Sequence, residues 1–187
     1  MMLSRRSLDA TEQKLDGRTI AGYAAVYGED SREIVEQGRA FVERIAPGAF
    51  GETLRKSSDV KLLYNHDPAA LLARTKSGTL KLRSDRNGLA FEASLPETSL
   101  GNDVRALLER GDLTGEMSFG FYVEDESWNA KRTERLVKRA KLVEVSIVQD
   151  AAYPQTNSSL RSVSAASIEA ARLRLELHMQ RMIQWTS

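Results

Sequence analysis

The segment TLKLRSDRNGLAFEASL, residues 79–95, constrains the fold more than any other stretch of the chain. Apolar and polar residues alternate on both sides of Asp85–Gly88, which is typical of two half-buried β-strands. The pair Asn87 and Gly88 can adopt the positive φ angles that a tight turn requires. The sequence therefore predicts a β-hairpin here, and with it a domain that contains antiparallel strands.

Several other segments favour strands. Residues 18–28, RTIAGYAAVYG, are small and apolar, and the run VKLLYN at 60–65 ends in turn-forming residues. Two longer apolar segments follow at 116–128 and 134–154, with the polar sequence NAKRT between them. Because the connection is short and polar, we expect these two strands to pair. The fold class predicted is α+β and strand-rich.

Few helices are expected in this part of the chain. Pro47 is a candidate first residue of a short helix, since proline is favoured at that position. A second helix is predicted in SLGNDVRALLERGDL, with Ser99 or Asn102 as its N-cap and Gly111 as its end.

The composition changes from Ser162 onward, after the polar linker QTNSS. Apolar residues then recur at a helical spacing, at Ile168, Ala171, Leu175, Met179 and Met182. The sequence thus predicts an N-terminal arm at 1–17, a domain at 18–160 and a C-terminal amphipathic helix within 161–187. That helix either packs on the domain or docks to a scaffold protein or a second copy of the chain, and the two readings are equally supported.

Composition excludes several classes of function. Lysine and arginine number 27 against 26 aspartate and glutamate, and there is no long basic run, so nucleic acid is not an expected partner. The chain has no cysteine, no signal-peptide pattern and no stretch long enough to span a membrane, which favours a soluble cytoplasmic protein. The two histidines, His66 and His178, lie in different predicted segments, so neither a metal site nor any cofactor is expected, and His178 is given no catalytic role.

Serine chemistry remains, and three residues are its candidates. Ser118 lies in an apolar strand beside Gly120, where it is either a tolerated small residue or a hydroxyl that faces a cleft. His66 lies between turn formers and is either a turn residue or the general base that a serine nucleophile needs. Glu144 interrupts an apolar strand, so it is either exposed at an edge or buried with a partner.

Strand alternation bears on the carboxylate. It places Leu142, Glu144 and Ser146 on one face of the strand and Val143 and Val145 on the other. Asp67 is the rival of Glu144 as the partner of the histidine. A residue next to His66 on an extended chain points away from it, which favours Glu144.

The segments YNHDP, RGDLTGEMSFGF and LVEVSIVQDAAYP, in this order, resemble the capsid-maturation (prohead) serine proteases of tailed bacteriophages. These peptidases are distantly related in fold to the herpesvirus assembly protease. GYAAVYG and ERIAPGAF, nearer the N-terminus, are also similar to that family, and the likeness spans roughly residues 18–160.

The resemblance implies an antiparallel β-barrel surrounded by a few helices, with His66 as general base, Ser118 as nucleophile and Glu144 as the residue that orients His66. It also implies partners: the major capsid protein, its scaffold or delta-like segment, and the protease itself through self-association. The expected location is the immature capsid, or prohead, in the host cytoplasm.

Two other functions use the same residues. One is a non-catalytic capsid-assembly or scaffold module with the same barrel. The other is an esterase or amidase that acts on small molecules, although the chain lacks the Gly-x-Ser-x-Gly elbow of the commonest such fold.

Overall fold

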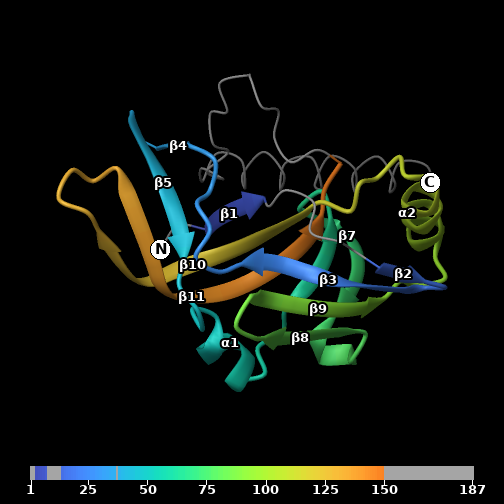
Figure 1. Ribbon diagram of the computed structural model, residues 1–187. Coiled ribbons are helices and arrows are strands. Elements are labelled where there is room, and N and C mark those ends of the chain that lie inside the picture. The colour runs from blue at the N-terminus through green and yellow to red at the C-terminus, as the bar shows by residue number, and fades with distance from the viewer. Residues whose placement is uncertain (1–2, 8–13, 37, 150–187) are drawn as a thin grey trace, which may run out of the picture.

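The computed structural model describes residues 3–7, 14–36 and 38–149, and Figure 1 labels their elements. The strands are β1 (Leu3–Ser7), β2 (Lys14–Asp16), β3 (Thr19–Val26), β4 (Ile34–Glu36), β5 (Arg39–Ile45), β6 (Lys61–Tyr64), β7 (Asp67–Arg74), β8 (Leu80–Ser84), β9 (Gly88–Ser94), β10 (Met117–Trp128) and β11 (Glu134–Ile147). The helices are α1 (Gly51–Arg55), α2 (Ser99–Arg110) and the 3₁₀ turn η1 (Thr75–Ser77).

The long antiparallel pair of β10 and β11 organises the larger of two sheets. That sheet runs in the order β1-β10-β11-β5-β4, and β6 pairs with both β11 and β7. Strands β5 and β6 run parallel to β11, β5 beside its first half and β6 beside its last residues. The sheet is therefore mixed. It curls as a half-barrel, and strands far outnumber helices among the described elements, which confirms the strand-rich α+β prediction. The prediction of a fully antiparallel barrel is wrong, because β11 has parallel neighbours.

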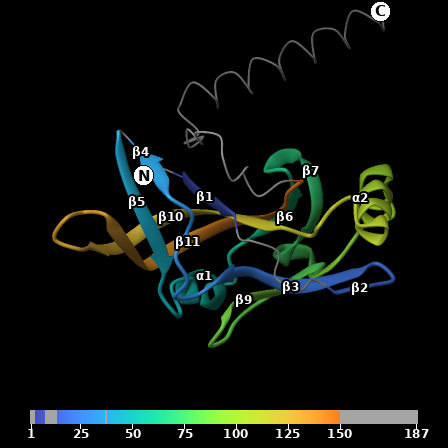
Figure 2. The same cartoon turned by 45° about the horizontal axis from the view of Figure 1, so that its top comes forward.

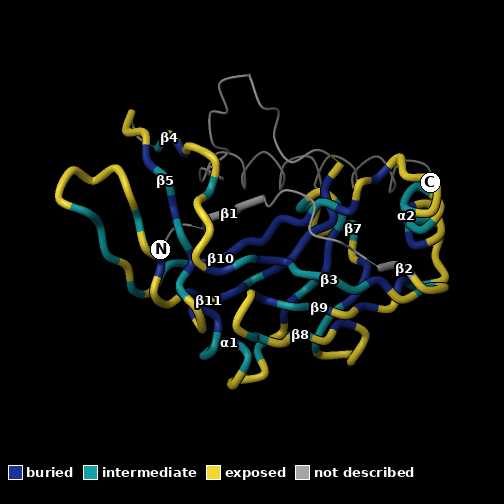
Figure 3. Tube along the Cα trace, in the orientation of Figure 1, coloured by how far each residue is buried: buried dark blue, intermediate teal, exposed yellow. Residues whose placement is uncertain are grey.

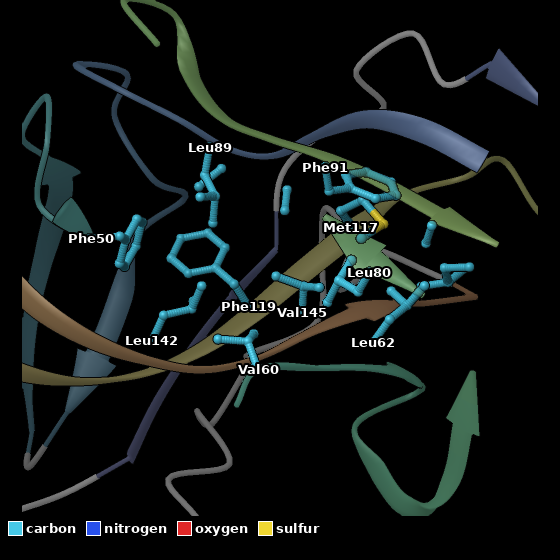
Figure 4. Close-up of a cluster of buried hydrophobic side chains, with 14 of the residues drawn as sticks. Phe50, Val60, Leu62, Leu80, Leu89, Phe91, Met117, Phe119, Leu142 and Val145 are labelled. Atoms are coloured by element: carbon cyan, nitrogen blue, oxygen red, sulfur yellow. The ribbon is translucent and has the colours of Figure 1, made fainter. Parts of the chain in front are cut away.

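The second sheet has the order β2-β3-β9-β8 and is antiparallel throughout. It lies beside the β10–β11 pair, as both views show (Figures 1 and 2). Between the sheets lies the hydrophobic core, where Met117 and Phe119 of β10 face Leu89 and Phe91 of β9 (Figure 4). Phe50, just before α1, packs edge-on against Phe119 with ring centroids 5.8 Å apart. Each fully buried side chain of this size contributes about 1.5–3 kcal/mol.

The predicted hairpin is present as β8 and β9, but its turn is built differently from the expectation. The Asp85 carboxylate accepts hydrogen bonds from the backbone N–H groups of Asn87 (2.8 Å) and Gly88 (3.1 Å) and from the Tyr23 hydroxyl (3.0 Å). The Asn87 N–H is the main reason that the pKa of Asp85 lies below its usual value. Gly88 does not supply a positive φ; an added Cβ would lie 2.1 Å from the carbonyl oxygen of Ala25.

The helices begin at different residues from those predicted. Helix α1 starts at Gly51, because residues 47–50 form turns first, so the assignment of Pro47 as the first helical residue is wrong. Helix α2 is capped by Thr98, whose hydroxyl accepts the Gly101 N–H at 3.2 Å, rather than by Ser99 or Asn102. Gly111 ends α2 with a φ of 78°, as expected.

A bulge interrupts the pairing of β10 with β11. Gly120 lies opposite Glu144, but the next residue, Phe121, lies opposite Leu142, so Val143 is an extra residue in β11. The alternation of β11 therefore changes phase at this point. Leu142 joins the buried core and does not share a face with Glu144, which corrects the expectation.

Figure 3 shows buried residues along the central part of the molecule, where the first five residues of β10 pair with the last residues of β11. The boundary predicted near residue 160 and the C-terminal helix lie outside the described residues. No helix among the described residues is long and apolar enough to cross a membrane.

Candidate active site

His66 lies in the two-residue turn between β6 and β7. Tyr64 pairs with Asp67 across this turn, and both Asn65 and His66 have positive φ, 51° and 58°. Positive φ at both central residues is the geometry of a type I′ hairpin turn, where Asn-Gly is the preferred pair. A histidine in the glycine position costs roughly 1–2 kcal/mol of backbone strain. The prediction that His66 lies in a turn is correct. A turn with a purely structural role would have glycine at this position, because glycine adopts positive φ without strain.

The turn is fixed to the end of β11. The Asn65 N–H donates to the Ile147 carbonyl at 2.9 Å, and the Asn65 side-chain oxygen accepts the Gln149 N–H at 3.1 Å. The Gln149 side-chain amide in turn donates to the Tyr64 hydroxyl at 2.6 Å. These bonds hold the backbone of His66 beside the last residues of β11.

The Glu144 side chain is buried, and its carboxylate contacts the imidazole of His66. Its Oε1 accepts a hydrogen bond from Nδ1 of His66 at 2.7 Å, and the two side chains are 4% and 19% exposed. Its Oε2 accepts the Ser146 hydroxyl at 2.6 Å. In the neutral imidazole the nitrogen that donates to the carboxylate is Nδ1, which leaves the lone pair on Nε2. Of the two sequence alternatives for Glu144, burial with a partner is the correct one.

Ser118 lies on β10, on the face away from the core. Its neighbours Met117 and Phe119 point into the hydrophobic cluster, so Ser118 and Gly120 point the other way. Ser118 is opposite Ser146, and Gly120 is opposite Glu144. A Cβ added to Gly120 would lie only 2.5 Å from Glu144 Oε1, so the carboxylate leans over β10 at this glycine.

These contacts bring the three predicted residues to one neighbourhood on one face of the sheet. The His66 ring bonds an oxygen that lies above Gly120, and Ser118 is two residues along the same strand face. Asp67, the rival carboxylate, is exposed and accepts the Ala69 N–H at 2.8 Å within its own strand. Glu144 is therefore the carboxylate that contacts the histidine.

Ser118 itself is only 1% exposed, and Ser146 is fully buried. The sequence did not reveal this burial, because strand alternation identifies a face and not what covers it. The sequence identifies Gly120 only as a neighbour of Ser118. Its role as the space for the carboxylate depends on the cross-strand register, whereas Ser146 and Glu144 lie two residues apart on the same face of β11. Among the described residues, no cluster of three or more His, Cys, Asp or Glu side chains could hold a metal ion.

A histidine held by a buried carboxylate near a strand serine is the set of side chains that serine hydrolases use. The model of the Caudovirus prohead serine protease family matches residues 4–172, and the chain belongs to this family. The fold is similar to that of the bacteriophage T4 capsid assembly protease, gp21, with a TM-score of 0.54 at 13% sequence identity. That match covers 79% of this chain and 96% of the other. No curated protein matches the sequence.

Proposed function

We propose that this chain is a serine endopeptidase that cleaves capsid or scaffold protein, and itself, inside the prohead. The family supports a role as a phage prohead serine protease. The observation that carries the catalytic assignment is the hydrogen bond from His66 to Glu144, directly above Gly120 on the strand that bears Ser118. The T4 protein of similar fold is a capsid assembly protease, which supports the choice of substrate class.

In the proposed mechanism Ser118 Oγ attacks the carbonyl carbon of the peptide bond while Nε2 of His66 takes the hydroxyl proton. The Glu144 carboxylate holds the Nδ1–H and stabilises the imidazolium that forms. The imidazolium then gives its proton to the leaving amine, and an acyl ester remains on Ser118. Water, deprotonated by the same nitrogen, hydrolyses the ester and restores the serine.

The burial of Ser118 is compatible with one competing function. A hydroxyl that is 1% exposed suits a non-catalytic assembly module as well as it suits an enzyme whose site opens when substrate binds. The two differ in whether the serine reacts. A small-molecule esterase would react in the same way and is distinguished by its substrates.

The test is labelling of the full-length protein with a biotinylated fluorophosphonate, followed by peptide mass mapping. We expect the label on Ser118, its loss in Ser118→Ala and a strong decrease in His66→Ala. Ser127→Ala, on the same strand β10 but far along it, is the matched control and should label as wild type. An unlabelled Ser118 in folded wild-type protein, together with no processing of co-expressed capsid protein, would support the assembly module and exclude the triad.

Cleavage is tested separately by co-expression with the major capsid protein of the same phage and mass spectrometry of the products. Processing that persists in Ser118→Ala would refute the assignment of this nucleophile. Labelling without any cleavage of capsid, scaffold or protease would favour the small-molecule hydrolase.

A further inference from the structure

The two oxygens of the Glu144 carboxylate have different partners. Oε1 accepts from His66 Nδ1 at 2.7 Å, and Oε2 accepts from Ser146 Oγ at 2.6 Å. Ser146 is two residues along β11 on the same face and has no solvent exposure. A short O–H···O⁻ bond in a buried site is among the stronger hydrogen bonds in proteins.

The terminal torsion of a glutamate is broad, so burial alone does not fix which way its carboxylate plane faces. Bonds to both oxygens fix that plane. The direction in which Oε1 presents its lone pair decides how the imidazole is turned, and therefore where Nε2 points.

Gly120 limits the carboxylate from the other side. Its Cα lies opposite Glu144, and a Cβ there would be 2.5 Å from Oε1 and 3.1 Å from both Cγ and Cδ. Gly120 does not have a positive φ, so its backbone would accept alanine. Glycine at this position therefore leaves room for the Glu144 side chain, which a Cβ would displace.

We propose that Ser146 and Gly120 are positioning residues, which set the orientation of the Glu144 carboxylate and through it that of His66. The effect on catalysis rests on the function proposed above, whereas the effect on the imidazole does not. A merely structural role predicts something else: Ser146 would be a satisfied buried hydroxyl and Gly120 a small strand residue, and neither would influence the histidine.

The first readout is the imidazole itself, observed as the downfield proton resonance of the His66 Nδ1–H. The chain has two histidines, so His178→Gln assigns the signal. We expect the resonance in wild type and in Ser118→Ala. It should move upfield or disappear through solvent exchange in Ser146→Ala and in Gly120→Ala. Ser146→Cys, which keeps a weaker donor of similar size, should be intermediate.

The second readout is the rate of fluorophosphonate labelling at Ser118. For Gly120→Ala the carboxylate must retreat by about 0.9 Å to reach ordinary contact at 3.4 Å. A misplacement of about 1 Å costs on the order of 100-fold in rate, so we expect a decrease of roughly that size. Ser146→Ala should decrease the labelling rate by a similar order, with Ser146→Cys between it and wild type.

Melting curves are the check that each variant is folded. Ser146→Ala removes one oxygen and adds no atom, so a change in the His66 resonance in this variant does not arise from a steric clash. An unchanged His66 resonance in both Ser146→Ala and Gly120→Ala, with labelling within twofold of wild type, overturns the inference. If wild-type Ser118 is not labelled and is not required for capsid processing, the proposed function fails, and the resonance still decides whether the two residues position His66.

Discussion

The backbone of His66 offers a way to separate function from stability at one residue. His66→Gly and His66→Ala both remove the imidazole and its bond to Glu144, so they differ only in what the backbone tolerates at a φ of 58°. Alanine keeps the left-handed strain of roughly 1–2 kcal/mol, which glycine relieves. Glycine gains unfolded-state entropy that offsets about 0.5–1 kcal/mol of this relief.

We therefore expect His66→Gly to be more stable than His66→Ala by about 0.5–1 kcal/mol in urea unfolding. In a chain of this length, 1 kcal/mol corresponds to a Tm difference of about 2–4 °C. Labelling and cleavage should both decrease strongly in each variant. Asp67 provides the control, since it is the next residue, is exposed and lies in a strand. Asp67→Gly should be less stable than Asp67→Ala. If His66→Ala equals or exceeds His66→Gly in stability, the strain argument is wrong.

Three further predictions follow from other parts of the chain. Glu144→Gln should leave the fold intact and lower the labelling or cleavage rate by up to roughly ten-thousandfold. The reason is that an amide does not stabilise the imidazolium. Near-normal rates would indicate that Asp67 is the partner of His66, or that Ser118 and His66 act as a dyad. The lowered pKa of Asp85, caused first by the Asn87 N–H, stabilises the fold above the ordinary value of 3.8, and this contribution is lost as the pH falls through the lower folded-state pKa. Asp85→Asn should reduce the loss of stability on acidification, and identical pH dependence would contradict this. The active enzyme should trim itself between roughly Ala152 and Ala166, which intact mass checks; a stable full-length species that cleaves another substrate excludes it.

Local pattern was sufficient for the elements whose contacts lie close in sequence. The hairpin of β8 and β9, the helix that ends at Gly111 and the pairing of β10 with β11 were all predicted, since each depends on alternation and turn-forming residues nearby. The parallel neighbours of β11 were not predicted. Parallel pairing brings together segments that are far apart in the chain, and no local pattern identifies the partner.

The site was predicted only in part, for a related reason. The three residues came from a resemblance and from the need of a serine for a base, and their meeting depends on a hydrogen bond between residues 78 apart in the sequence. Alternation correctly put Ser146 on the face of Glu144, but not the bond between them. The extra residue in β11, the positive φ of His66 and the space above Gly120 arise from tertiary structure.

The bulge at Val143 makes this part of the chain tolerant of losing one residue. Core residues before it, such as Leu142, and core residues after it, such as Val145, are separated by an odd number of positions. Removing Val143 would make this separation even, so unbroken alternation would keep Leu142 and Val145 on the core face and Glu144 and Ser146 on the other. A single deletion there would be absorbed by loss of the bulge, whereas at the present length a β11 without the bulge would turn either Leu142 out of the core or Glu144 into it. In aligning or engineering related chains, a one-residue gap at this bulge is therefore compatible with the same core and with the same face for Glu144 and Ser146.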